Sequence, residues 1–166
     1  MMNRGLRAFT LIEMLITAAI VSVIAGLAID MFGGSRFERV DAGVRLLEAD
    51  LGYARSVALS TPADPVLLRI AANGSSYHLA HTSAPDTALT GPNGPLRTTF
   101  GSGRAEVAAG LLITSSASRD ITFGPFGGVM DPVPTIFVST SDGPERAQVV
   151  LDPFTGDLTV TYQSPK

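Results

Sequence analysis

The sequence predicts an α+β protein, in which a long N-terminal helix, first apolar and then amphipathic, packs on an antiparallel β-sheet domain. Three observations support this fold class. Apolar residues are concentrated in residues 9–32, although hydrophobic residues make up 45% of the whole chain and charged residues only 16%. Residues 37–58 carry apolar side chains in steps of three and four, the period of a helix with one buried face. From residue 62 onward, short apolar runs alternate with Gly, Pro, Asn and Asp, which is typical of strands and turns.

The N-terminal segment has the charge pattern of a membrane anchor. Residues 1–8 form a leader that holds Arg4 and Arg7 and no acid, and residues 14–29 carry no charge. That charge-free stretch would make roughly 24 Å of helix, and ~20 apolar residues normally span the hydrocarbon core. Adding the apolar positions before it predicts a transmembrane and assembly helix at residues 9–31. Because basic flanks stay on the cytoplasmic side, we expect a cytoplasmic N-terminus and a C-terminal domain outside.

Glu13 is an acid inside this apolar segment. A carboxylate costs ~2.5–3.5 kcal/mol at the centre of a bilayer, so one interpretation gives Glu13 a function. The other interpretation is a capping box, Thr10-Leu-Ile-Glu13, whose acid complements the helix dipole. Spacing alone leaves both open. A removable secretory signal cut after Ala28 is a third possibility, but it leaves Glu13 unexplained.

A second helix is expected at residues 32–61. Asp30 ends the charge-free run and two glycines follow it, so residues 30–35 are a predicted kink or hinge. The helix should stop before Pro62, because proline restricts the residue that precedes it. Its apolar stripe is predicted to pack on the protein's own β-domain. The opposite face is predicted to carry Arg39, Asp41, Arg45 and Asp50.

The remaining residues, 62–166, are predicted to form an antiparallel β globular domain. The pair Asn73-Gly74 lies between two β-like runs and is a strong hairpin signal. Residues 82–106 are rich in Gly and Pro and are expected to form a long, poorly structured loop. The candidate strands are residues 66–71, 76–81, 107–114, 120–123, 135–140, 146–152 and 157–162.

No catalytic or metal site is predicted, and no cofactor is expected. The chain has no Cys, which excludes a thiol nucleophile and Cys-type zinc ligands. His78 and His81 are three residues apart in a predicted strand, so their side chains should point to opposite faces. Asp152 and Asp157 flank a turn, and turn formation accounts for both. We therefore expect the protein not to be an enzyme.

Two further features bear on binding partners. Residues 37–166 hold nine basic and thirteen acidic residues, a net charge of −4, and no basic run follows Arg7. Because nucleic acid binding depends on Lys and Arg, no nucleic acid partner is expected. The loop at residues 124–128, Gly-Pro-Phe-Gly-Gly, is interpreted as a tight turn with Phe126 in the core. The alternative is a ligand loop that exposes Phe126.

The run Phe9-Thr-Leu-Ile-Glu13, after a short basic leader and before an apolar helix, resembles the class III signal of type IV pilins and type II secretion pseudopilins. The resemblance implies that a prepilin peptidase cuts between Ala8 and Phe9 and methylates the new amino terminus of Phe9. Ala8 stands where the family usually has Gly. The resemblance also implies that Glu13 pairs with the amino terminus of a neighbouring subunit and sets the axial register of assembly.

Three segments of the body, residues 51–59, 121–127 and 149–160, are similar to the GspH/FimT group of that family. This similarity implies a pilin-like fold in a minor pseudopilin of a type II secretion system. Such a chain is a single-pass protein of the bacterial inner membrane with a periplasmic domain. After processing it is assembled into a periplasmic pseudopilus that drives protein export. The implied partners are other pseudopilins, the prepilin peptidase and methyltransferase, and the inner-membrane secretion platform.

Two alternatives stay open. One is a FimT-like minor pilin of a type IV pilus or DNA-uptake system, although the chain lacks the basic tail expected of a DNA-binding member. The other, from a different class, is a membrane-anchored periplasmic β-domain that acts as a binding module.

Overall fold

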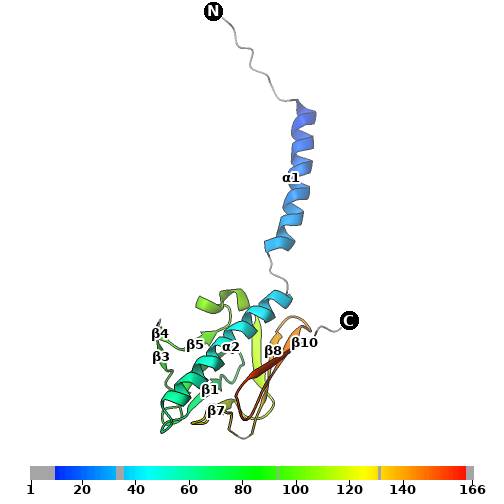
Figure 1. Ribbon diagram of the computed structural model, residues 1–166. Helices are drawn as coiled ribbons and strands as arrows, with labels where there is room; N and C mark the ends of the chain where they lie inside the picture. The colour runs from blue at the N-terminus through cyan, green and yellow to red at the C-terminus, as the bar shows by residue number, and fades with distance from the viewer. Residues whose placement is uncertain (1–9, 33–35, 93, 131, 164–166) are drawn as a thin grey trace, which may run out of the picture. The chain divides into compact units, whose positions relative to one another are not determined.

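The computed structural model describes residues 10–32, 36–92, 94–130 and 132–163. The chain divides into two compact units, Met1–Gly34 and Ser35–Lys166, and each is described by itself. The first unit contains helix α1, Leu11–Phe32, and the second contains helix α2, Arg36–Ser60, with all the strands (Figure 1). The α+β class is therefore confirmed.

Helix α1 is apolar on all sides, since large hydrophobic side chains such as Leu11, Leu15, Ile20 and Ile24 are all more than half exposed. Within the described part of the chain, no helix combines the length and apolar character needed to span a lipid bilayer. The membrane-spanning role of residues 9–31 therefore stays a prediction. Helix α1 continues through Phe32, so the first residues of the predicted kink at 30–35 are helical, and residues 33–35 lie outside the described part.

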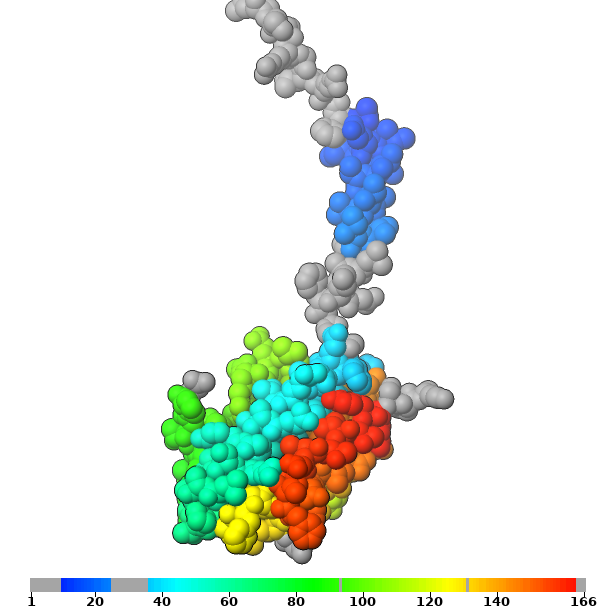
Figure 2. Space-filling view, viewed as in Figure 1, coloured from blue at the N-terminus to red at the C-terminus, as the bar shows by residue number. Residues whose placement is uncertain are grey.

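Helix α2 is about 37 Å long, at 1.5 Å per residue over its 25 residues. Its last turn ends where hydroxyl groups of Ser60 and Thr61 donate to the carbonyl of Val57, each at 2.8 Å, just before Pro62. One stripe of the helix is buried against the sheets, and the opposite side is open along one face of the domain (Figure 2). The buried residues of α2 are Val40, Gly43, Val44, Leu47, Asp50, Leu51, Ala54 and Ala58.

Two four-stranded antiparallel sheets hold the rest of the core. The first has the strand order β5-β2-β1-β7 and the second has the order β10-β9-β8-β6. The first is built from β1 (Val66–Ile70), β2 (Ser76–His81), β5 (Arg97–Thr99) and β7 (Asp120–Phe123). The second is built from β6 (Leu111–Ser115), β8 (Thr135–Thr140), β9 (Arg146–Leu151) and β10 (Leu158–Gln163).

The Asn73-Gly74 hairpin is confirmed. Strands β1 and β2 pair antiparallel with Ile70 opposite Tyr77, and Gly74 has a φ of 69°, which favours glycine. The observed bounds of β2, β7 and β8 coincide with the predicted runs. Strands β1 and β9 end one residue early, and β10 is shifted by one residue at both ends. The run predicted at 107–114 is shorter as a strand, because the 3₁₀ helix η1 (Gly103–Ala108) occupies its start.

Residues 82–106 are more regular than expected. They contain the short pair β3 (Thr90–Gly91) and β4 (Gly94–Pro95), strand β5 and the start of η1. Strand β5 pairs with β2 in the register Tyr77 opposite Thr98, and it completes the first sheet. The expectation of a poorly structured loop is wrong here, because three residues that lack a sequence pattern of their own gain ladder hydrogen bonds from β2.

The core lies where α2 crosses the inner faces of both sheets. Leu47 of α2, Leu68 of β1, Ile113 of β6 and Val149 of β9 are fully buried in a single cluster. Burying each such side chain stabilises the fold by about 1.5–3 kcal/mol. Helix α2 thus belongs to the same compact unit as the strands, and joins the two sheets into one domain.

Candidate processing and assembly site

The start of α1 is fixed by Thr10. Its hydroxyl oxygen accepts the backbone N–H of Glu13 at 3.3 Å, and its carbonyl accepts the backbone N–H groups of Glu13 and Met14 at 3.1 and 3.2 Å. Thr10 therefore acts as the N-cap that the sequence indicated, and Glu13 lies in the first turn of the helix. A carboxylate in this turn complements the partial positive charge of the helix N-terminus.

The carboxylate of Glu13 is exposed and has no hydrogen-bond or ion-pair partner among the described residues. The polar side chains further along α1 behave differently. The hydroxyl of Thr17 donates to the carbonyl of Glu13 at 2.9 Å, and the hydroxyl of Ser22 donates to the carbonyl of Ala18 at 2.8 Å. These hydroxyls are satisfied inside the helix, as an apolar environment requires, whereas the Glu13 carboxylate is exposed and makes no such bond.

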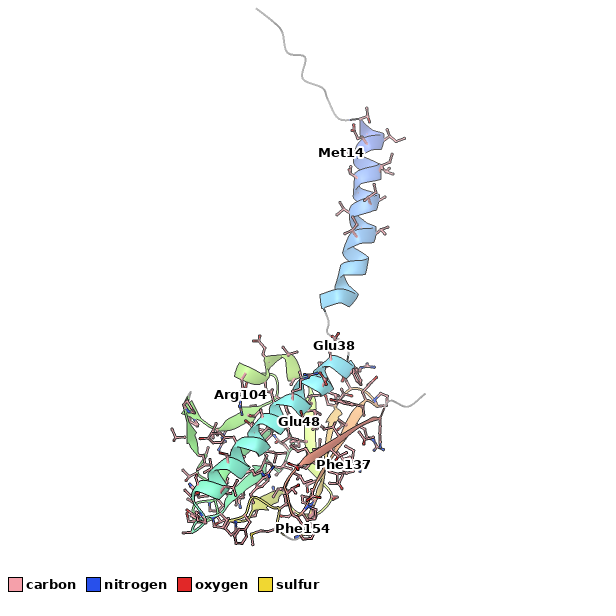
Figure 3. All side chains as sticks on the ribbon, viewed as in Figure 1. Met14, Glu38, Glu48, Arg104, Phe137 and Phe154 are labelled. Atoms are coloured by element: carbon pink, nitrogen blue, oxygen red, sulfur yellow. The ribbon has the colours of Figure 1, made fainter. Side chains whose placement is uncertain are left out.

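The surface around Glu13 is apolar. Leu11, Ile12 and Ile16 are 84%, 68% and 52% exposed, and the side chain of Met14 projects from the same part of α1 (Figure 3). In lipid or in a bundle of like helices, such a surface packs through van der Waals contact. Ala8 and Phe9, the residues of the predicted cleavage and N-methylation, lie outside the described residues.

The domain contains a polar cluster that the sequence did not indicate. Asp50 of α2 is buried, and its Oδ2 accepts hydrogen bonds from the Tyr77 hydroxyl at 2.9 Å, from the Thr98 hydroxyl at 3.0 Å and from the guanidinium of Arg104. The prediction that Asp50 lies on the polar face of its helix is wrong. Asp50 is three residues after Leu47 and one residue before Leu51, which both belong to the buried stripe of α2. The helical period therefore places Asp50 beside that stripe.

This cluster is structural in character. Burial raises the pKa of Tyr77 above its ordinary range, so the hydroxyl stays protonated and donates to Asp50. Arg104 lies beside α2 (Figure 3), and its side chain is 43% exposed. The carboxylate joins α2, β2, β5 and η1, and every oxygen contact it makes is to its own domain.

Strand β10 is tied to the start of α2 by a second polar contact. The hydroxyl of Tyr162 donates to Oδ1 of Asp41 at 2.7 Å, and its ring lies 5.1 Å from the ring of Phe37, centre to centre. Burial and this hydrogen bond raise the pKa of Tyr162 to about 12. The Tyr162 hydroxyl therefore keeps its proton near neutral pH, and the hydrogen bond to Asp41 holds across the physiological range.

The two histidines make separate local contacts. Nε2 of His78 lies 3.0 Å from the carbonyl oxygen of Pro85, and Nδ1 of His81 lies 3.1 Å from that of Asp64. No group of three or more His, Cys, Asp or Glu side chains in the described ranges is placed to hold a metal ion. Each histidine therefore fixes a neighbouring loop.

The predicted turns near the end of α2 differ in outcome. Oδ1 of Asp152 accepts the backbone N–H groups of Phe154 and Thr155 at 2.9 and 2.7 Å, as a turn-forming aspartate does. These two hydrogen bonds hold the pKa of Asp152 below its usual value, and the bond from Thr155 contributes more than the bond from Phe154. Phe126, expected in the core, is 89% exposed, so that prediction is wrong. Of the two glycines that follow it, Gly127 lies against Arg55 and Leu59 of α2, and Gly128 lies against the loop of Pro153 and Phe154.

The structure thus describes an apolar helix with a capped start and an acid in its first turn, followed along the chain by an α+β domain. Residues 3–29 match the family model described as the prokaryotic N-terminal methylation motif, the signature of type IV pilins and pseudopilins. The motif is that of pilin-like chains, which are processed by prepilin peptidase and assemble with other pilins, and the match covers the N-terminal segment of this chain. Comparison with curated proteins gave no match, and comparison with solved structures gave none.

Proposed function

We propose that the protein is a minor pseudopilin of the GspH type in a type II secretion system. Cleavage between Ala8 and Phe9 and N-methylation of Phe9 produce the mature chain, which residues 9–31 hold in the inner membrane. The subunit then enters a periplasmic pseudopilus whose growth drives export of folded proteins. Its partners are other pseudopilins, the prepilin peptidase that also methylates, and the inner-membrane secretion platform.

The observation that carries this proposal is the Glu13 carboxylate, which is exposed in the first turn of α1 and has no partner in the described chain. An unpaired carboxylate within a bilayer costs ~2.5–3.5 kcal/mol near the centre and less near the surface. The amino terminus of Phe9 on an adjacent subunit offsets that cost. Glu13 is four residues beyond Phe9, and four residues rise about 6 Å in a helix. Pairing between subunits therefore sets an axial stagger of that order.

Mass spectrometry of the mature N-terminus tests the processing step. We expect a chain that begins with N-methylated Phe9. A chain that begins at Ile29 would identify a secreted protein, and an uncut chain that begins at Met1 would identify a simple signal anchor. Either result would refute the proposal.

A substitution series at Glu13 tests the assembly step. We expect Glu13→Leu and Glu13→Gln to be inserted and processed normally but to be incorporated poorly into the filament, measured by crosslinking to neighbouring subunits. Glu13→Asp, which keeps the charge, should retain part of the incorporation. Glu106→Gln, an exposed acid of η1, is the control and should behave as wild type. Wild-type incorporation of Glu13→Leu would refute the register role.

The domain supports secretion over DNA uptake through its charge. Residues 37–166 have a net charge of −4, and a polyanion is repelled by an acidic surface. Deleting the gene should reduce export of a folded substrate and leave DNA uptake unchanged. The opposite result would favour the FimT-like minor pilin, and no change in either would favour the separate binding module.

A further inference from the structure

We propose that the outer face of the first sheet carries a binding site for a single carboxylate group, supplied by an acidic segment of a partner protein. The site is a cleft of about 450 Å³ lined mainly by polar residues of β1, β2, β5 and the segment before β7. Its volume lies within the range of ligand sites in proteins, ~300–1,000 Å³. The inference rests on the domain alone and does not depend on the proposed secretion role.

The floor of the cleft is a row of charged and polar side chains that crosses all four strands. Asp120 of β7 pairs in register with Arg69 of β1, Arg69 pairs with His78 of β2, and His78 pairs with Arg97 of β5. Residues in register on adjacent strands share a face of the sheet. Ile70, which follows Arg69, and Tyr77, which precedes His78, are buried in the core. Because side chains alternate between the two faces of a strand, the charged row faces outward.

Arg69 is already neutralised. Its Nε and Nη2 donate to the two oxygens of Asp120 at 2.8 and 2.6 Å, and its Nη1 donates to Asp86 at 2.6 Å. These bonds, with Asp120 as the main cause, raise the pKa of Arg69, and they hold the pKa of Asp120 below its usual value. The hydrogen bond between His78 and Pro85 fixes the rim that carries Asp86. Arg69 is therefore part of the framework of the cleft.

Arg97 and Arg119 are the free cations of the cleft. Both line it and are exposed, and neither side chain has a hydrogen-bond or ion-pair partner among the residues that the structure describes, while the charge of Arg119 contributes to the lowered pKa of Asp120. Three arginines against two aspartates leave a local charge of about +1 when histidine is neutral. One carboxylate neutralises that charge, while the surrounding acidic domain disfavours a polyanion.

The donor geometry suits a carboxylate. A guanidinium presents a planar fork that binds the two oxygens of a carboxylate at once, which an ammonium cannot do. The hydroxyl groups of Ser76 and Ser118 also line the cleft and can donate to the same group. Asp86 and Asp120 in the wall repel a dianion such as phosphate more strongly than they repel a monoanion. An Asp or Glu side chain of a peptide is thus the occupant that the charges favour.

The test is a binding measurement with the full chain in zwitterionic nanodiscs, and the probe is a fluorescent, end-blocked hexapeptide of five glycines and one glutamate. We expect Arg97→Gln combined with Arg119→Gln to weaken peptide binding at least tenfold. Arg36→Gln combined with Arg45→Gln removes the same charge from exposed positions of α2 and is the matched control, with an expected change of less than twofold. Circular dichroism should show the same fold in all variants.

Equal weakening by the control pair would overturn the proposal, because it would show attraction by net charge alone. The same peptide with glutamine in place of its one glutamate would overturn it as well if it bound as tightly. Inorganic phosphate that displaces the peptide at lower concentration than acetate does would overturn the choice of a carboxylate. Arg97→Lys combined with Arg119→Lys keeps the charge and removes the forks, so we expect at least threefold weaker binding; unchanged affinity would refute fork recognition.

Discussion

Replacement of Asp50 by alanine is expected to cost the domain about 3–5 kcal/mol of unfolding free energy. The change removes the acceptor of two buried hydroxyls, those of Tyr77 and Thr98, which are each 1% exposed. A buried donor left without a partner costs about 1–3 kcal/mol. The lost ion pair with Arg104 adds only about 0–1 kcal/mol, because that side chain is 43% exposed and screened by solvent. Domains typically have an unfolding free energy of about 5–15 kcal/mol, so the substitution would remove a large part of it.

Urea denaturation of the full chain in detergent micelles measures this loss. The chain has no Trp, and its three tyrosines lie at positions 53, 77 and 162, so tyrosine fluorescence reports on the domain alone. With a slope of about 2 kcal/mol per molar urea, the midpoint should fall by about 2 M. Asp50→Asn keeps one acceptor oxygen and should lose about 1–2 kcal/mol. Glu106→Ala, at an exposed position, should change stability by less than about 0.5 kcal/mol.

A double-mutant cycle separates the hydrogen bond from general packing. Tyr77→Phe should cost about 1 kcal/mol or more in the wild-type background and clearly less when Asp50 is already alanine. Equal costs in the two backgrounds would show that the two groups are not coupled. That result, or a loss of less than about 1 kcal/mol for Asp50→Ala, would refute the reasoning.

Four other changes have defined outcomes in the same assay. Gly52→Ala adds a methyl group with no atom within 4 Å and should stabilise α2 by about 0.5–1 kcal/mol, whereas Gly43→Ala places its Cβ 2.5 Å from a buried leucine methyl and should destabilise by about 1–3 kcal/mol. Phe126→Ser should cost less than about 0.5 kcal/mol, because the ring is exposed. Asp120 has a pKa lowered by its arginine partner, so its contribution is present above its unfolded pKa of about 3.9 and is lost as pH falls through the folded value. Asp120→Asn should therefore flatten the acid-side decline in stability.

The features that the sequence predicted are those that local patterns determine. Alternation along residues 135–140 places every second side chain of β8 in the core, and the Asn73-Gly74 pair supplies the positive φ of its turn. The apolar stripe of α2 similarly follows from the period of the helix. In each case a few neighbouring residues carry the whole signal.

The features that the sequence did not predict depend on contacts between residues far apart along the chain. Strand β5 has only three residues, and its structure comes from pairing with β2. Asp50 is buried because donors from β2, β5 and η1 converge on it, and those donors are 27, 48 and 54 residues away along the chain. Phe126 is exposed because the glycines after it pack against Arg55 and Pro153, which no local pattern indicates.

Glu13 and Asp50 pose the same physical problem and receive different solutions. Asp50 lies beside the buried stripe of α2 and Glu13 lies in the apolar helix α1, and a charged group removed from water needs donors. Asp50 receives three donors from its own domain, whereas Glu13 receives none among the described residues. The first arrangement stabilises the fold, and the second leaves Glu13 open for the pairing between subunits that we propose.

This difference makes a paired prediction. Substitution of Asp50 should lower the unfolding free energy of the domain and leave cleavage before Phe9 unchanged, because the cleavage motif is confined to residues 3–29. Substitution of Glu13 should leave the domain's urea midpoint unchanged and reduce filament incorporation. Both variants are compared for midpoint, mature N-terminal mass and crosslinking. A Glu13→Leu chain with a lowered midpoint and normal crosslinking would reverse the two roles, and the assembly argument would then fail.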